Sequence, residues 1–379
     1  MELIMKRYRI FILLYALTLC FTIACSPDKK LPAEMVSAID SVRTKWVPDR
    51  RINIFNVDTV FRDGRWQITA ETTVPDAKQA LEAIVNRYLA PEERQVQINL
   101  LPAPDLGDSI HALVCVSVAN LRRSPQHSAE LVDQVVCGMV LKVLKRKSYW
   151  YLIQTPSGYA GWITGGSFSR IDGNDLSKWT AARKVMVGAN YAQVLSDPNE
   201  GSTVLSDAVL GSVYKWEEDH GLWTRIMLPD GREGYIRSTV LQTFRSPDDT
   251  ARPDGKAIVK RAKSLLGIPY LWGGHSSKGF DCSGFTGTVF RIEGRQLPRD
   301  ANMQAQLGQL IEPDSTYGNI IPGDLIFFGP DDRITHVGIS LGGPDFIHCS
   351  DDVHINSLDD SDPLFNAYRK RTFRFFKRL

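Results

Sequence analysis

Two segments in the middle of the chain end in the same short pattern, and this repeat most strongly restricts what the chain can fold into. Residues 158–163 read Gly-Tyr-Ala-Gly-Trp-Ile, and residues 231–236 read Gly-Arg-Glu-Gly-Tyr-Ile. Short β-rich runs broken by Gly, Pro and Asp precede both endings, which is typical of small β-barrels. The repeat therefore predicts two copies of one barrel, at residues 106–173 and 180–245.

The regions on either side of the repeat have different patterns. Before it, residues 25–105 mix apolar residues at helical spacing with short extended runs, which predicts a small α+β domain. After it, a polar linker that contains proline leads into residues 252–379, a stretch long enough to bury a core of its own. The predicted fold class is α+β, with two barrels between a small N-terminal domain and a C-terminal domain.

Residues 1–24 are predicted to be a signal peptide. Lys6, Arg7 and Arg9 precede an apolar run at 10–23, which is short for a bilayer span and fits an export signal. A buried N-terminal helix is the alternative, although such helices usually carry a polar face. The residues that end at Cys25 resemble a bacterial lipobox, which implies a lipid anchor on Cys25; secretion without a lipid stays open. We expect an exported protein of the periplasm or cell envelope.

Composition and charge argue against some classes of function. The formal net charge of the 379 residues is only +2, which does not favour a nucleic-acid partner. Basic residues near the C-terminus alternate with phenylalanines, a pattern typical of a final strand with a solvated basic face. Because the chain contains neither a CxxC nor an HExxH motif, we expect no metal and no cofactor.

Cys115 and Cys137 lie within one predicted barrel and allow two interpretations. In the oxidising surroundings of an exported protein, the two thiols can form a disulfide. Alternatively they are two small buried side chains, which is the more usual role of free cysteines. Both interpretations stay open at the level of the sequence.

Cys282 and two histidines form a candidate catalytic set. Cys282 follows Asp281 and precedes small and apolar residues that suit a buried helix, whose N-terminus would stabilise a thiolate. His336 and His348 each stand in a short apolar run, and two adjacent strands would direct His336 toward Cys282 with His348 behind it. In such an arrangement one imidazole exchanges the proton and the next fixes its tautomer.

The C-terminal domain resembles the NlpC/P60 family of papain-like cysteine peptidases, and both barrels resemble bacterial SH3 domains. The resemblance to the family implies Cys282 as nucleophile, His336 as base and His348 as the third, polar member of the triad. It rests on motifs in the family's order and spacing, which are Tyr270-Leu271-Trp272-Gly273-Gly274, Asp281-Cys282-Ser283-Gly284-Phe285, Leu297-Pro298-Arg299-Asp300, Pro322-Gly323-Asp324-Leu325-Ile326-Phe327-Phe328 and His336-Val337-Gly338-Ile339.

The full layout resembles a narrower group of the family, the γ-D-glutamyl-L-diamino acid endopeptidases. The resemblance implies release of L-Ala-γ-D-Glu from peptidoglycan stem peptides with a free amino-terminal L-Ala. A free ammonium in a closed pocket needs a carboxylate partner, and Asp281, beside the nucleophile, is well placed for this role. Glu130 matches the position where this group supplies an acid from the first barrel. Ser283 and Asp300 match positions that contact the dipeptide.

Some of these residues have a second interpretation. Tyr270 is suited to donate its hydroxyl to the developing oxyanion together with the Cys282 backbone N–H, and is otherwise a core tyrosine. Glu130 is otherwise a solvated barrel residue. Asp300 is otherwise the cap of a helix that starts near Asn302.

Two other functions compete with this hypothesis. An enzyme on the same Cys-His scaffold can instead cleave intact cross-linked wall, or act as an amidase or acyltransferase. A protein of another class would bind the wall through its barrels without catalysis. The complete set of Cys282, His336 and His348 argues against the second alternative, because each member needs the others.

Overall fold

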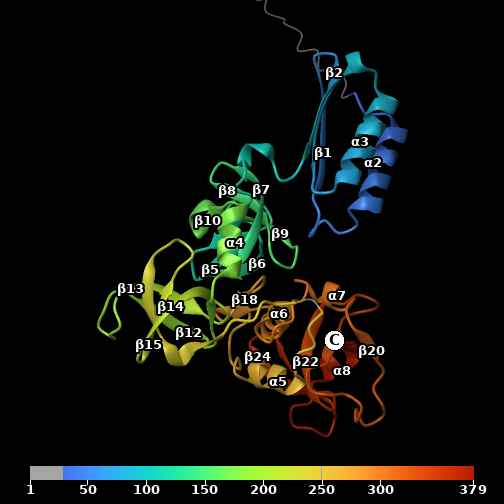
Figure 1. The fold of residues 1–379 in the computed structure, drawn as a ribbon. Coiled ribbons are helices and arrows are strands. Elements are labelled where there is room, and N and C mark those ends of the chain that lie inside the picture. The colour runs from blue at the N-terminus through green and yellow to red at the C-terminus, as the bar shows by residue number, and fades with distance from the viewer. Residues whose placement is uncertain (1–28, 249) are drawn as a thin grey trace, which may run out of the picture. The chain divides into compact units, whose positions relative to one another are not determined.

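The computed structural model describes residues 29–248 and 250–379, so the predicted signal peptide and Cys25 lie outside the described residues. The chain forms two compact units (Figure 1). The smaller unit holds residues 29–48 together with Phe55–Glu71 and Pro75–Ile98. The larger unit holds Asp49–Ile54, Thr72–Val74 and Asn99–Leu379.

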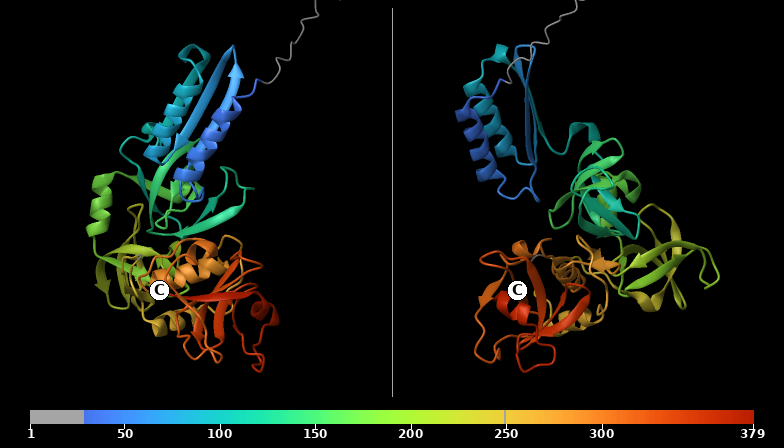
Figure 2. Two further views of the ribbon diagram at one scale, coloured as in Figure 1. Left: turned by 90° about the vertical axis from the view of Figure 1, so that its right-hand side faces the viewer. Right: turned by 180° about the vertical axis from the view of Figure 1, so that it is seen from behind.

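The smaller unit has two helices and a sheet with the strand order β1-β2-β3. The helices pack against each other and cover one face of the sheet, as Figure 2 also shows. The buried side chains of β2 alternate along the strand, which is the pattern of a sheet with one covered face. The predicted α+β character of this region is confirmed. Its elements are α2 (Ala33–Trp46), β1 (Phe55–Arg62), β2 (Arg65–Thr72), α3 (Pro75–Tyr88) and β3 (Arg94–Leu100).

The larger unit begins with two seven-stranded sheets that share one topology. The first has the order β10-β4-β7-β8-β9-β5-β6, and the second, read from its other edge, has the corresponding order β17-β11-β14-β15-β16-β12-β13. This agreement confirms the tandem repeat. The strands of the first sheet are β4 (His111–Val114), β5 (Val118–Arg122), β6 (Leu131–Val136), β7 (Val140–Lys147), β8 (Trp150–Gln154), β9 (Ala160–Thr164) and β10 (Phe168–Ile171). After α4 (Gly173–Ala181) come β11 (Lys184–Val187), β12 (Tyr191–Leu195), β13 (Val204–Val209), β14 (Val213–His220), β15 (Trp223–Met227), β16 (Glu233–Arg237) and β17 (Leu241–Thr243).

The repeated Gly-x-x-Gly ending has a structural reason. Gly158 and Gly231 adopt φ angles of +82° and +87°, a conformation that favours glycine, in the turns before β9 and β16. A Cβ on Gly161 would lie 3.0 Å from Leu121 on β5, and one on Gly234 would lie 2.6 Å from Val194 on β12. In each copy the first glycine therefore makes the turn, and the second lets two strands approach closely.

Cys115 and Cys137 are free thiols. Cys137 is buried and Cys115 is half-buried, with the Cys137 sulfur 3.8 Å from the carbonyl oxygen of Cys115. The interpretation as two packed side chains is therefore confirmed.

The last part of the chain places a buried helix, α6, against a six-stranded antiparallel sheet with the order β20-β25-β21-β22-β23-β24. Phe285 and Val289 of α6 share a core with Val337 and Ile339 of β22. The elements are α5 (Gly255–Lys263), β18 (His275–Ser276), β19 (Gly279–Phe280), α6 (Cys282–Ile292), α7 (Ala301–Gln304), β20 (Gln309–Ile311), β21 (Leu325–Phe328), β22 (His336–Gly342), β23 (Asp345–Cys349), β24 (Val353–Ser357), α8 (Ala367–Thr372) and β25 (Phe373–Arg378).

The predicted final strand is β25, which lies between β20 and β21. Phe376 on this strand is buried, as the alternating pattern predicts. Arg378 is half-buried and its guanidinium pairs with the buried carboxylate of Asp324 at 2.7 Å, so the basic face is not simply solvated. None of the helices in the described part of the chain is long and apolar enough to span a membrane.

Candidate active site

Cys282 is the first residue of α6, and Asp281 caps this helix. The Asp281 carboxylate accepts a hydrogen bond from the Gly284 backbone N–H at 2.7 Å, which satisfies a free donor of the first turn. All eleven residues of α6 are buried, which explains why this segment has no polar face. The candidate nucleophile therefore sits at the start of a helix that is buried along its length.

His336 and His348 come from neighbouring strands, as predicted. His336 begins β22, and His348 lies on β23, which pairs with β22 in a register that sets Ile339 opposite Ile347. A Cβ on Gly338 would lie 3.1 Å from the Cβ of His348, so glycine leaves room for that side chain. His336 Nε2 and His348 Nδ1 are 2.9 Å apart and share a hydrogen bond.

The hydrogen-bond network fixes which nitrogen of His336 is basic. The Oδ1 atom of Asn356 lies 3.0 Å from His348 Nε2 and also accepts from Asn366 Nδ2 at 2.9 Å, while Asn356 Nδ2 donates to the Ile355 carbonyl. Since this oxygen only accepts, His348 carries its proton on Nε2 and accepts on Nδ1. His336 must then donate from Nε2, which leaves the lone pair of its Nδ1 to act as the base.

Burial controls the charges of the nucleophile and the base. It raises the pKa of Cys282 to about 12, the neighbouring Asp281 carboxylate adds to the effect, and hydrogen bonds from backbone N–H groups only partly oppose it. Burial, followed by the charge of Arg369, holds the pKa of His336 well below its ordinary value. Burial therefore favours a neutral thiol and a neutral imidazole, and it opposes the thiolate that the start of the helix would stabilise.

A cleft of about 350 Å³ opens beside Cys282, and all but one of the predicted site residues line it. His348 lies behind His336 and does not line the cleft. The predicted residues brought together here are Glu130, Tyr270, Asp281, Cys282, Ser283, Asp300 and His336. A volume of this order suits a small peptide.

Every carboxylate that lines the cleft is paired with an arginine. Arg299 contacts Asp281 at 2.6 Å, and Arg51 contacts Asp300 at 2.7 Å. Arg123 contacts Glu130 at 2.5 Å, and this hydrogen bond lowers the pKa of Glu130.

Three of the substrate-binding candidates make side-chain contacts with neighbouring residues of the cleft. Glu130 accepts a hydrogen bond from Trp272 Nε1 at 3.0 Å, so its carboxylate faces the cleft as well as solvent. Ser283 Oγ lies 3.2 Å from Asp281 Oδ1 and 3.0 Å from Arg299 Nη1. Asp300 precedes α7, but its side chain makes no capping hydrogen bond and contacts Arg51 instead.

Asp133 and Arg299 form a buried network that the sequence patterns do not predict. Arg299 Nε donates to Asp133 at 2.6 Å, and His275 Nδ1 lies 2.9 Å from the same carboxylate oxygen. Although burial opposes it, Arg299 and His275 lower the pKa of Asp133. The available signal was a single aspartate within the apolar run of β6.

Arg51 and Asn356 were also missed. Arg51 reaches Asp300 across 249 positions of sequence, and no motif surrounds it. Asn356 acts only through its contact with His348, which depends on the pairing of β23 with β24. Neither contact leaves a local sequence signal.

Two family models match the chain. The model of the NlpC/P60 family matches residues 267–374, which include the cysteine and both histidines. The model of the bacterial SH3 domain matches residues 117–169 in the first barrel.

Relatives with similar sequences cover more than half of this chain. Dipeptidyl-peptidase 6 of Lysinibacillus sphaericus is 30% identical over 266 residues, which are 68% of this chain and 94% of the relative. The γ-D-glutamyl-L-lysine dipeptidyl-peptidase of Bacillus subtilis is 38% identical over 233 residues, which are 57% of this chain and 71% of the relative. The crystal structure of an NlpC/P60 family protein from Bacillus cereus has a TM-score of 0.61 at 23% identity and covers 71% of this chain and 99% of its own.

Proposed function

The chain belongs to the NlpC/P60 family of cysteine peptidases, and we propose that it releases L-Ala-γ-D-Glu from peptidoglycan-derived peptides with a free amino-terminal L-Ala. The observation that carries this proposal is a small cleft in which the nucleophile and base lie beside three carboxylates, each paired with an arginine. The names of the two relatives, both dipeptidyl-peptidases, support it.

The geometry fits acyl transfer through a thioester. Cys282 Sγ attacks the carbonyl carbon of the γ-amide while its proton passes to His336 Nδ1. When the tetrahedral intermediate collapses, the C–N bond breaks and His336 returns the proton to the departing amine of the diamino acid. Water then attacks the thioester with His336 as base, and the dipeptide leaves. Because burial disfavours the separate charges of a thiolate and an imidazolium, we expect proton transfer to accompany the attack.

The developing oxyanion needs hydrogen-bond donors. Tyr270 lines the cleft beside Cys282, and we assign its hydroxyl to the oxyanion together with the Cys282 backbone N–H. Burial raises the pKa of Tyr270, so that its hydroxyl keeps the proton it would donate.

The substrate's charges match those of the cleft. A peptide that begins L-Ala-γ-D-Glu carries a free ammonium and, since its γ-carboxyl forms the amide, a free α-carboxylate. The ammonium would pair with Glu130 and Asp281 in place of some of their contacts with Arg123 and Arg299. An arginine released in this way, or Arg51, would receive the α-carboxylate. A zwitterionic substrate thus exchanges partners with existing ion pairs, and no charge is left buried alone.

Export remains part of the proposal. The basic start and apolar run before Cys25 support delivery to the cell envelope, where peptidoglycan peptides are found, with Cys25 as the point of lipid attachment. These residues lie outside the described part of the chain. A shift of the mature protein from the membrane to the soluble fraction on Cys25→Ser would support the anchor; equal fractionation would contradict it.

Product analysis tests the proposed reaction. The protein, incubated with L-Ala-γ-D-Glu-diaminopimelate and with L-Ala-γ-D-Glu-L-Lys, is expected to yield L-Ala-γ-D-Glu by mass spectrometry. Cys282→Ala removes the nucleophile and is expected to abolish product, whereas Cys349→Ala removes a buried thiol outside the cleft and should retain it. Unchanged hydrolysis by Cys282→Ala, or release of a different fragment, would contradict the assignment.

A further inference from the structure

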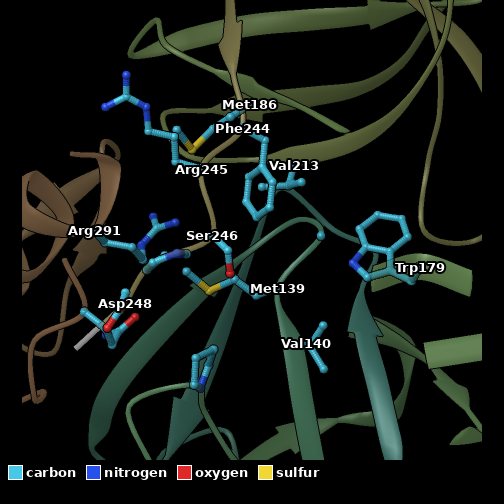
Figure 3. A pocket seen from close by; sticks show the side chains of 14 residues that line it. Met139, Val140, Trp179, Met186, Val213, Phe244, Arg245, Ser246, Asp248 and Arg291 are labelled. Atoms are coloured by element: carbon cyan, nitrogen blue, oxygen red, sulfur yellow. The ribbon is translucent and has the colours of Figure 1, made fainter. Parts of the chain in front are cut away.

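A second cavity lies apart from the catalytic cleft. It has a volume of about 670 Å³ and shares no lining residue with the cleft. Its walls come from the first barrel, α4, the second barrel, the linker and the end of α6, as Figure 3 shows. Its size falls in the range of small-molecule sites. The proposed reaction does not use it.

Arg291 lines this cavity and lacks the partners that a buried charge needs. Its side chain lies in the last turn of α6 and the residue is only 6% exposed. Among the described residues, its hydrogen bond is a long one of 3.5 Å, from Nη1 to the Gly211 carbonyl. The Nε and Nη2 atoms are shielded from solvent and have no hydrogen-bond partner within the described structure. An unsatisfied buried charge is strongly destabilising, so a partner outside the chain is the simplest reason for this arrangement.

The two unsatisfied nitrogens define the geometry of that partner. Nε and Nη2 lie on the same edge of the planar guanidinium, where their N–H bonds run parallel. This edge matches the two oxygens of a carboxylate in a bidentate contact. Because the edge is screened from water, such a charge-assisted pair would be stronger than one at the surface.

The other lining residues indicate the rest of the ligand. Met139, Met186 and Phe244 contribute apolar surface, and methionine adapts to ligands of different shape. Among the charged lining residues, Arg245 and Arg291 are positive and Asp248 is negative, which leaves an excess of one positive charge. A monoanion balances this charge, whereas a phosphate dianion would exceed it.

We propose that this cavity binds a small monocarboxylate with an apolar body, held by a bidentate contact with Arg291. The apolar body would lie against Met139, Met186 and Phe244. Residues 244–247 of the linker form neither helix nor strand, so this wall can yield to admit the ligand. In the proposed complex the Arg291 side chain turns its shielded Nε and Nη2 edge toward the cavity. Since α6 carries Cys282 at one end and Arg291 at the other, the ligand would bind at the far end of the catalytic helix.

Calorimetry with a matched pair of probes tests the proposal on the full chain. 3-Phenylpropionate is expected to bind saturably with a Kd of about 1 mM or tighter, and its neutral amide at least tenfold more weakly. Equal binding of the acid and the amide, or no saturable binding of the acid, would overturn the proposal. Inorganic phosphate is expected to bind more weakly than the acid, and tighter binding of phosphate would overturn the assigned chemistry.

A variant of the arginine gives a second, independent readout. Arg291→Met removes the charge and keeps the length of the side chain, so it is expected to weaken binding of 3-phenylpropionate at least tenfold and to raise the Tm of the free protein. The matched control Arg65→Met changes an exposed arginine of β2 and should alter neither value. Unchanged binding, or a lower Tm that shows a structural role for the charge, would count against the proposal.

Discussion

At Asn356, one side-chain oxygen accepts hydrogen bonds from both His348 and Asn366. This oxygen determines the tautomer of His348 and, through it, that of His336. Asn356 does not line the cleft and is therefore a positioning residue. General-base catalysis by His336 Nδ1 depends on it, because the opposite tautomer would present an N–H to the thiol.

Replacing Asn356 tests this dependence. Asn356→Ala removes the acceptor, so we expect kcat to fall about tenfold to a hundredfold with little change in KM. Asn356→Asp keeps the acceptor and is expected to retain more of the activity. The same two substitutions at Asn99, an exposed residue of β3, are controls and should leave kcat unchanged. Equal losses for Asn356→Ala and Asn356→Asp would indicate a merely structural role.

The pH dependence of kcat/KM follows from the lowered pKa of His336. Because burial depresses this pKa, the base stays neutral as the pH falls past the ordinary value of about 6.5, and activity is lost only at lower pH. Asn356→Asp places a negative charge near the histidines, which raises their pKa, so the acid limb should move to higher pH. A wild-type acid limb above pH 6.5, or no shift in the variant, would contradict the account.

At the residue scale, the candidate catalytic residues could be proposed from the sequence, whereas the residues that support them could not. Cys282, His336 and His348 stand in motifs whose spacing survives in the sequence. The partners Asp133, Arg51 and Asn356 act through contacts made only after strands and domains pack. The raised pKa of the Cys282 thiol could not be predicted either, because the loss of hydration depends on the whole surrounding structure.

At the element scale, α6 depends on two glycines that face different surroundings. A Cβ on Gly284 would lie 2.0 Å from the backbone carbonyl of Gly274, which cannot move without shifting the loop beside Asp281. A Cβ on Gly287 would lie 3.1 Å from His275 Nε2, the end of a side chain. Replacement of glycine by alanine should therefore be strongly destabilising at Gly284 and only weakly so at Gly287.

Gly284→Ala is expected to lower the free energy of unfolding by about 1–3 kcal/mol or more and to reduce activity, because it displaces the start of the helix that carries Cys282. Gly287→Ala should change stability by less than about 1 kcal/mol, since alanine favours the helix and His275 can adjust. Urea unfolding and a peptide-hydrolysis assay measure both effects. Equal stability of the two variants would contradict the close contact between Gly284 and the Gly274 carbonyl.

Elements with clear periodicity could be predicted from the sequence. The helices α2 and α3 and the strands of the small unit follow the expected pattern, and the repeated glycines marked equivalent turns in both barrels. The partial burial of the basic face of β25 could not be predicted, because Arg378 pairs with Asp324, which is 54 positions away in sequence.

At the scale of the whole molecule, the first barrel contributes residues to the candidate cleft. It supplies Glu130 to the cleft and the buried Asp133 to Arg299, while Gln134 accepts a hydrogen bond from the His275 backbone N–H at 3.0 Å. The second barrel makes a more exposed contact, in which Asp207 pairs with Lys278 at 2.5 Å. The sequence indicates separate domains. It does not indicate that residues of the first barrel line the cleft of the last domain.

The two interdomain ion pairs should differ in their contribution to stability. Asp133→Ala leaves Arg299 and His275 buried without that carboxylate and is expected to lower the free energy of unfolding by about 3–5 kcal/mol. Asp207→Ala is the matched control and should cost only about 0–1 kcal/mol, because its pair is largely exposed. Chemical denaturation measures both. A smaller loss for Asp133→Ala than for Asp207→Ala would contradict the integral role of the first barrel.

A cysteine peptidase whose cleft requires a free amino terminus should cleave a peptide with a free L-Ala nitrogen much faster than the same peptide acetylated there. Initial rates are measured by mass spectrometry for L-Ala-γ-D-Glu-diaminopimelate and for the same peptide acetylated on its L-Ala nitrogen, with wild type, Glu130→Gln and Cys282→Ala. In wild type, acetylation is expected to lower kcat/KM at least about a hundredfold. Glu130→Gln is expected to reduce the ratio of kcat/KM for the free peptide to kcat/KM for the acetylated peptide. Cys282→Ala is expected to cleave neither peptide. Equal cleavage of the free and the acetylated peptide by the wild-type protein would contradict the requirement for a free amino terminus.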